Sequence, residues 1–182
     1  MNPLNKNNVY EPECHLDSSP RDYENRRSLR EAHFDIKCRN DMYKFSSAWA
    51  NDPAVREALH IHKGSREKWK RCNYDVNTTA DLTNVILYHK DLSRRGGYRS
   101  LIYSGTADSI VPTLSTEAWI KSLDYPIVDQ WRAWLVDGQC AGYTRSYANN
   151  MTFASGGGHV APEYKPKECQ AMLKRWISHA PL

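Results

Sequence analysis

The chain has 182 residues, of which 40 % are hydrophobic, so length and composition predict one domain with an ordinary core. Its 25 basic and 21 acidic residues are mixed along the chain and leave a net charge of +4, a balance that argues against a nucleic-acid or membrane partner. No apolar run approaches the ~20 residues that cross a bilayer. The polar stretch from Met1 to Asn8 has no hydrophobic region typical of a secretory signal.

The first part of the chain, residues 1–44, is polar, charged and poor in periodicity, which predicts an irregular segment. Asp52-Pro53 then predicts an N-cap and a first-turn proline for a helix that runs to about Leu59. A second helix is expected to begin at residue 78 or 79. Gly96-Gly97 ends it, because glycine readily leaves the helical conformation.

The second part of the chain alternates between strand and helix patterns. Residues 98–103 predict an apolar strand and residues 113–123 an amphipathic helix. Aromatic and β-branched residues alternate with polar ones over 130–154 around Asp137-Gly138, a strong hairpin signal. A final helix is predicted over 166–178. The order helix, strand, helix, hairpin, strand, helix is typical of the last units of an α/β sheet.

Two loops after predicted strands each carry one side chain suited to catalysis. The first, in Gly105-Thr106-Ala107-Asp108, presents a carboxylate, and the second, in Gly156-Gly157-Gly158-His159, presents an imidazole. Either loop alone would be interpreted as an ordinary turn. Together, in the order Asp then His, they match the last two members of the Ser…Asp…His triad of an α/β-hydrolase. The nucleophile elbow, G-x-S-x-G, occurs nowhere in the 182 residues.

The imidazole of His159 would take the proton of a serine hydroxyl and return it to the leaving group, and Asp108 would orient that imidazole. A possible metal pair, His60 and His62, has no third ligand at suitable spacing, and zinc sites need three or four. These two are therefore interpreted as surface histidines, and no metal or cofactor is expected.

The two loops resemble the C-terminal region of serine carboxypeptidases, more closely that of the plant serine carboxypeptidase-like proteins. That group includes glucose-ester-dependent acyltransferases and a hydroxynitrile lyase. Further stretches that carry the resemblance are residues 49–59, 68–72, 129–134 and 142–143, and the likeness runs from Val9 to the end of the chain. It covers only the C-terminal portion of such a protein. One departure is visible: the family's Gly-Asp-x-Asp is Gly105-Thr106-Ala107-Asp108 here.

The resemblance implies the C-terminal part of an α/β-hydrolase sheet with flanking helices over residues 45–182. Residues 1–44 would be an irregular segment from the insertion that caps the active site. It also implies a disulfide between Cys14 and Cys38, and a bridge from Cys72 to the N-terminal part of a complete protein. Cys140 and Cys169 are expected to be small buried thiols in a strand and a helix.

The activity implied by the resemblance is that of a serine-type carboxypeptidase, which hydrolyses C-terminal peptide bonds through a serine ester. A glucose-ester-dependent acyltransferase subunit and a non-catalytic truncated product remain alternatives. The isolated chain is expected to be inactive and to need an N-terminal or large-subunit chain that carries the serine. Two N-glycosylation sequons, at Asn77 and Asn150, together with five cysteines predict a secretory, extracellular or vacuolar protein if the chain is part of a full precursor.

Overall fold

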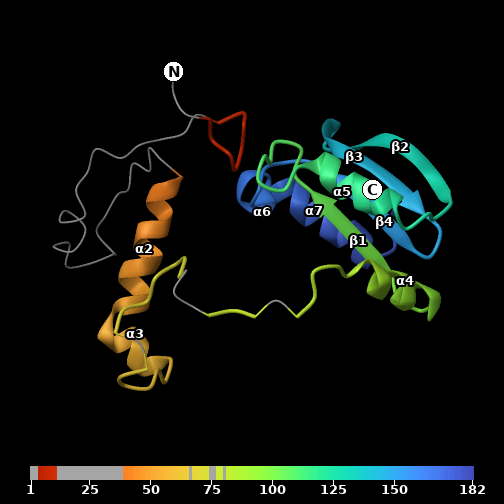
Figure 1. Ribbon diagram of the computed structural model, residues 1–182. Coiled ribbons are helices and arrows are strands. Elements are labelled where there is room, and N and C mark those ends of the chain that lie inside the picture. Colours follow the sequence, from red (N-terminus) through yellow and green to blue (C-terminus); the bar gives the residue numbers. More distant parts are fainter. Residues whose placement is uncertain (1–3, 12–38, 66, 74–76, 80) are drawn as a thin grey trace. The chain divides into compact units, whose positions relative to one another are not determined.

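The computed structural model describes residues 4–11, 39–65, 67–73, 77–79 and 81–182. The chain divides into two compact units (Figure 1). One combines Met1–Glu13 with Asp81–Leu182, and the other is Cys14–Ala80. The N-terminal residues therefore pack with the C-terminal half of the chain. The expected division into a cap segment and a hydrolase segment at residues 44 and 45 stays a prediction.

The larger unit is built on a mixed four-stranded sheet with the order β1-β4-β3-β2. Its strands are β1 (Ser100–Ser104), β2 (Ile127–Val136), β3 (Gln139–Tyr147) and β4 (Met151–Ser155). β1 runs parallel to β4, whereas β3 is antiparallel to both β4 and β2. The sheet with its flanking helices confirms the predicted α/β class (Figure 1).

The predicted hairpin is formed by β2 and β3, which meet at Asp137 and Gly138. Both turn residues have positive φ, 48° and 74°. A two-residue turn whose twist matches that of the flanking strands requires this left-handed conformation, which is why Asp-Gly predicts it.

Four helices belong to this unit: α4 (Ile86–Arg94), α5 (Thr113–Lys121), α6 (Ala161–Tyr164) and α7 (Pro166–Ile177). The predictions of α5 and α7 are confirmed. The second helix was expected to begin at residue 78 or 79, and this prediction is wrong because α4 begins at Ile86. Directly before it, the Asn84 side chain accepts a hydrogen bond from the Ile86 amide at 2.9 Å. The short helix α6 was not predicted.

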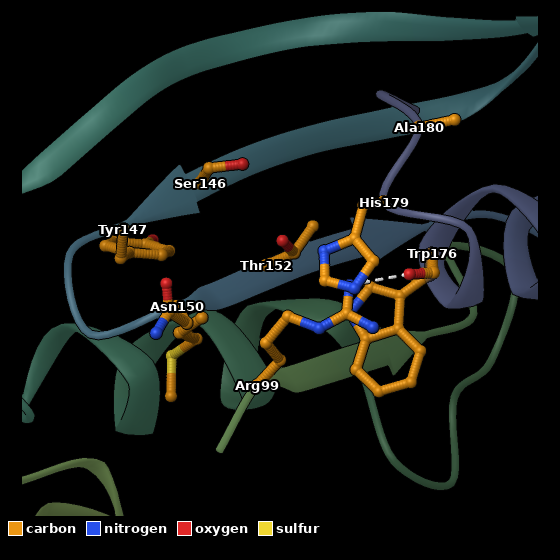
Figure 2. Close-up of a pocket in the computed structure, with 9 residues that line it drawn as sticks. Arg99, Ser146, Tyr147, Asn150, Thr152, Trp176, His179 and Ala180 are labelled. Atoms are coloured by element: carbon orange, nitrogen blue, oxygen red, sulfur yellow. Dashed lines mark hydrogen bonds between the residues drawn. The ribbon is translucent and has the colours of Figure 1, made fainter. Parts of the chain in front are cut away.

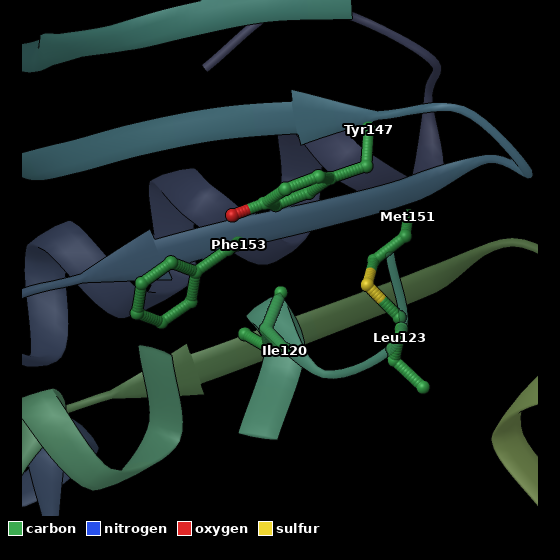
Figure 3. Packing of buried hydrophobic residues seen from close by; sticks show 5 residues of the cluster. All are labelled: Ile120, Leu123, Tyr147, Met151 and Phe153. Carbon is green, nitrogen blue, oxygen red and sulfur yellow. The ribbon is translucent and has the colours of Figure 1, made fainter. Parts of the chain in front are cut away.

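Each face of the sheet carries its own apolar core. On one face Phe153 and Met151 of β4 pack with Ile120 and Leu123, in and directly after α5 (Figure 3). On the other face Ala154 packs in a cluster with Trp134 and Val136 of β2 and Met172 of α7. The neighbours Phe153 and Ala154 belong to opposite clusters because successive side chains of a strand point to opposite faces.

The second unit contains α2 (Asn40–Asn51) and α3 (Pro53–Ala58). α3 confirms the predicted start, because the Asp52 carboxylate accepts hydrogen bonds from the amides of Ala54 and Val55 at 2.8 and 3.2 Å. α2 begins at residue 40, so the prediction of irregular structure is wrong for residues 40–44. The side chain of Asn51 accepts from the Trp69 amide at 2.7 Å and donates to its carbonyl at 3.0 Å, which fixes the Trp69 loop to the end of α2.

Within the part of the chain that the structure describes, no helix combines the length and apolarity needed to cross a membrane.

Candidate active site

The sheet topology brings the two candidate catalytic loops together. β1 and β4 are parallel neighbours in register, and their last residues, Ser104 and Ser155, stand side by side. Asp108 follows Ser104 by four residues, and His159 follows Ser155 by four. Parallel strands end at the same edge of a sheet, so the two loops emerge next to each other. This edge is where α/β proteins place their ligand sites.

Backbone hydrogen bonds join the two loops directly. The amide of Gly156 donates to the carbonyl of Ser104 at 3.1 Å, and the amide of Ala107 donates to the carbonyl of Gly157 at 2.9 Å. The loops therefore continue the contact between β1 and β4 beyond the ends of the strands. This arrangement fixes the backbone on both sides of the candidate acid and base.

The side chains of His159 and Asp108 form a hydrogen bond, with His159 Nδ1 2.9 Å from Asp108 Oδ2. The carboxylate is buried, with 6 % of its side chain exposed, whereas 35 % of the imidazole is exposed. The expected proximity of the two residues at one end of the sheet is confirmed. The acid thus lies beneath a base that faces solvent, which is the arrangement a proton-transfer pair needs.

The Asp108 carboxylate is held in its charged form. Burial opposes ionisation, but the hydrogen bond to His159 and two backbone amides outweigh burial and hold the pKa of Asp108 below its ordinary value of 3.8. Its Oδ1 accepts from the amides of Ile110 and Val111 at 2.7 and 3.2 Å. An ionised carboxylate can only accept, so Nδ1 of His159 carries a proton, and in the neutral imidazole Nε2 is then the nitrogen with the lone pair. His159 therefore has the tautomer of a general base.

Two further residues support the loops and were not singled out from the sequence. The hydroxyl of Tyr103 donates to the carbonyl of Gly156, which is the first of the three glycines that precede His159. Burial raises the pKa of Tyr103, so the phenol stays protonated and remains a donor. Thr113, at the start of α5, donates through its hydroxyl to the carbonyl of Gly105 at 2.9 Å. A tyrosine in a strand and a threonine at a helix start are common, so the sequence held no specific signal for either role.

In the described residues, no serine, threonine or cysteine side chain is hydrogen-bonded to His159. Those residues likewise contain no group of three or more His, Cys, Asp or Glu side chains that could hold a metal ion. At the position of the first acid in the family's Gly-Asp-x-Asp, this chain has Thr106, which is exposed. Asp108 obtains its two amide hydrogen bonds without that first acid.

The remaining predicted site residues are not part of this hydrogen-bonded pair. Cys14 and Cys38 are outside the described residues, so their pairing stays a prediction. Cys72 is a free, exposed thiol, and its bridge to another chain also stays a prediction. Asn77 is exposed, and Asn150 is exposed in the connection between β3 and β4.

Of the two cysteines expected to be buried, Cys169 is partly buried in α7, but Cys140 is exposed. The prediction for Cys140 is wrong because, among the described strands, β2 alone pairs with that end of β3, and most residues of β2 are exposed. Its thiol donates to the carbonyl of Gly142 at 3.5 Å.

A pocket of about 270 Å³ lies near the opposite ends of the strands, beside the start of β4 (Figure 2). Its lining includes Arg99, Asn150, Trp176 and His179, but neither Asp108 nor His159. Arg99 lies over the Trp176 ring at 4.6 Å and donates to the Trp176 carbonyl at 2.7 Å. The guanidinium is thus used to fix the end of α7, and the pocket is separate from the candidate active site.

An acid and a base in the loops after neighbouring parallel strands match the last two positions of an α/β-hydrolase triad. The family model described as serine carboxypeptidase matches residues 1–179. The chain therefore belongs to the serine carboxypeptidase family, whose fold is that of the α/β-hydrolases.

Similar proteins come from Arabidopsis thaliana. Serine carboxypeptidase-like 17 is 50 % identical over 147 residues, which are 80 % of this chain and 33 % of that protein. Serine carboxypeptidase-like 7 is 44 % identical over 181 residues, 98 % of this chain and 37 % of that protein. Serine carboxypeptidase-like 52 is 56 % identical over 136 residues, 74 % of this chain and 73 % of that protein. The chain spans about a third of the length of the first two relatives.

Proposed function

We propose that this chain supplies the general base, His159, and its orienting acid, Asp108, to a serine-type acyl-transfer site. The observation that carries the proposal is the 2.9 Å hydrogen bond between His159 Nδ1 and the buried Asp108 carboxylate. That carboxylate is itself fixed by two backbone amides. Membership of the serine carboxypeptidase family supports the same assignment.

In the proposed reaction Nε2 of His159 removes the proton of a serine hydroxyl as its oxygen bonds to the acyl carbon. The imidazolium that forms is stabilised by Asp108, and it passes the proton to the leaving group. His159 then deprotonates the acceptor, which attacks the serine ester, and the serine regains its proton. We propose that the serine comes from polypeptide outside these 182 residues, in the same precursor or in a large-subunit chain.

The acceptor decides between the two enzymatic alternatives. Water as acceptor gives a carboxypeptidase, which is the function we propose first, and a hydroxyl acceptor with a glucose-ester donor gives an acyltransferase. His159 serves either acceptor by the same proton transfer. Assay of one assembled enzyme with blocked dipeptides, and separately with a glucose ester and a hydroxyl acceptor, would separate these activities by their relative kcat/KM.

The test of the catalytic pair is labelling by a serine-directed fluorophosphonate. The chain would be co-produced in a secretory host with the N-terminal region of a serine carboxypeptidase-like relative. We expect labelling of the serine in the assembly and none in the chain alone. His159→Ala should lower the labelling rate by about 10³-fold or more, because the hydroxyl then has no base.

The matched control is His179→Ala, an exposed histidine that lines the separate pocket and should leave labelling unchanged. Labelling that is indifferent to His159→Ala would overturn the proposed role of His159. Folded assemblies that never react would instead favour the third alternative, a non-catalytic product.

We further propose that the protein passes through the secretory pathway to the cell exterior or the vacuole. The support is the family, the five cysteines and the exposure of both sequon asparagines, Asn77 and Asn150. Secretion of a tagged precursor from a eukaryotic host should add glycan mass, and Asn77→Gln with Asn150→Gln should remove it. A secreted protein with neither residue modified would contradict the glycosylation.

A further inference from the structure

A short N-terminal segment, residues 5–9, lies against the loop that carries Asp108; we call it the bridging segment. The carbonyl of Lys6 accepts hydrogen bonds from the amide and the hydroxyl of Ser109, each at 3.0 Å. The amide of Val9 donates to the carbonyl of Ala107 at 2.9 Å. The bridging segment thus holds the backbone on both sides of Asp108.

The same segment also contacts the loop that carries the base. The carbonyl of Asn7 accepts a hydrogen bond from the amide of His159 at 2.7 Å. The approach is so close that a methyl group on Gly158 would lie 2.6 Å from that carbonyl oxygen. His159 follows three glycines, which restrict the backbone little. The contact with Asn7 therefore restricts a residue whose own sequence leaves it free.

The bridging segment orders itself through its asparagines. The side-chain oxygen of Asn5 accepts from the amides of Asn7 and Asn8 at 3.1 and 3.4 Å. The side-chain oxygen of Asn8 accepts from the amide of Tyr10 at 3.2 Å, and Asn8 is buried. Such side-chain-to-backbone bonds fix a turn without help from a helix or sheet. The carbonyls of Lys6 and Asn7 are thereby presented to the two loops in a set geometry.

We infer that the bridging segment is a positioning element for the acid–base pair, in addition to the loops that carry the pair. The bridging segment forms hydrogen bonds with the residues on both sides of Asp108 and with the backbone of His159 itself. A misplacement of about 1 Å between reacting groups is enough to slow catalysis strongly. The catalytic consequence rests on the proposed function, whereas the positioning of the two side chains does not.

The test is the double variant Asn5→Ala with Asn8→Ala in the full chain, which removes both self-ordering side chains. Amide hydrogen exchange, followed residue by residue in dilute solution, should accelerate about tenfold or more at Ser109 and His159. The proton that Nδ1 of His159 donates to Asp108 should lose its separate downfield resonance in the NMR spectrum. The amides of β3 and β4 should keep their wild-type protection, which shows that the sheet is still folded.

Two controls separate positioning from general destabilisation. Asn84→Ala removes a side-chain-to-backbone bond of the same kind at the start of α4, and it should leave Ser109 and His159 unchanged. Asn5→Asp with Asn8→Asp keeps the accepting oxygens and should restore the wild-type exchange and the downfield resonance. Wild-type values for both readouts in the folded double Ala variant would overturn the inference.

If the double Ala variant does not fold, the wild-type chain still decides the question. The amides of Val9, Ser109 and His159 should then show one common opening free energy once each rate is divided by its intrinsic exchange rate, because one detachment of the bridging segment exposes all three. Clearly separate opening free energies for these three amides would overturn the inference. None of these measurements needs substrate or the serine, so failure of the proposed enzyme activity would leave their outcome unaffected.

Discussion

Gly105 and Gly158 face each other across the two loops so closely that a methyl group on Gly105 would lie 2.3 Å from the carbonyl oxygen of Gly158. Real carbon–oxygen contacts are much longer, so the loops of Asp108 and His159 approach each other only because no side chain stands between them. This backbone approach sets the distance between the acid and the base.

Gly105→Ala should therefore separate the loops. We expect the free energy of unfolding to fall by about 1–3 kcal/mol, as for other overpacked sites. The downfield NMR resonance of the His159 Nδ1 proton should shift or disappear. Gly97→Ala is the control: its position is open but has a φ of 76°, so it should cost about 1–2 kcal/mol and leave that resonance unchanged. A Gly105→Ala protein with wild-type stability and resonance would contradict the argument.

The lowered pKa of Asp108 predicts a pH dependence of stability. Because the folded-state pKa lies below the ordinary 3.8, ionised Asp108 stabilises the fold above about pH 4. That contribution is lost as the pH falls through the lowered folded-state pKa. Asp108→Asn should cost about 2 kcal/mol near pH 6, and the difference from wild type should shrink toward pH 3.

Urea unfolding at a series of pH values measures this dependence. Asp129→Asn is the control, because this partly exposed carboxylate pairs with Arg132 at 2.9 Å on the surface. Surface pairs of this kind contribute less than about 1 kcal/mol. Stability curves of wild type and Asp108→Asn that stay parallel down to pH 3 would show that Asp108 is not stabilised in its charged form.

The three described cysteines should differ in reactivity. Burial raises the pKa of Cys169, and its Sγ lies 3.8 Å from the Tyr103 hydroxyl. Cys72 and Cys140 are free and exposed. Because the thiolate is the reactive form, we expect both to be alkylated about tenfold or more faster than Cys169. Timed iodoacetamide labelling with peptide mapping measures the three rates, and urea should make them similar. Equal rates in the folded chain would contradict this order.

The isolated chain should self-associate as its concentration rises. β1 is an edge strand of the sheet, so no strand pairs with its outer side in the described part of the chain. Exposed strand edges and apolar patches drive association. Around α4, Leu82, Leu87, Tyr88 and Tyr98 are more than half exposed. Sedimentation velocity should show assemblies that weaken in Leu87→Lys but persist in Leu173→Lys, a control on α7 whose leucine is also more than half exposed.

A partner chain that carries the N-terminal region of the family should replace this self-association with a defined complex. We expect part of that complex to be joined through Cys72 and to separate on reduction, which a non-reducing gel would show. A monodisperse chain that unfolds cooperatively and leaves Cys72 reduced in the presence of the partner would contradict the proposal.

The sequence by itself determined the features that depend on local chemistry. Asp137-Gly138 predicted the hairpin because few residues adopt positive φ in two successive positions, and Asp52-Pro53 predicted the start of α3 because a carboxylate caps free amides. The order of Asp108 and His159 after two strands predicted an acid–base pair, and the structure places their side chains 2.9 Å apart.

Only the tertiary structure decided what depends on contacts between distant residues. The hydrogen bonds from Ser109 and His159 to Lys6 and Asn7 join parts of the chain about a hundred or more residues apart, and no local pattern encodes them. The exposure of Cys140 likewise depends on which strand covers its neighbours. Local patterns report backbone preference and the direction of a side chain, whereas packing between elements decides which side chains meet and which remain in solvent.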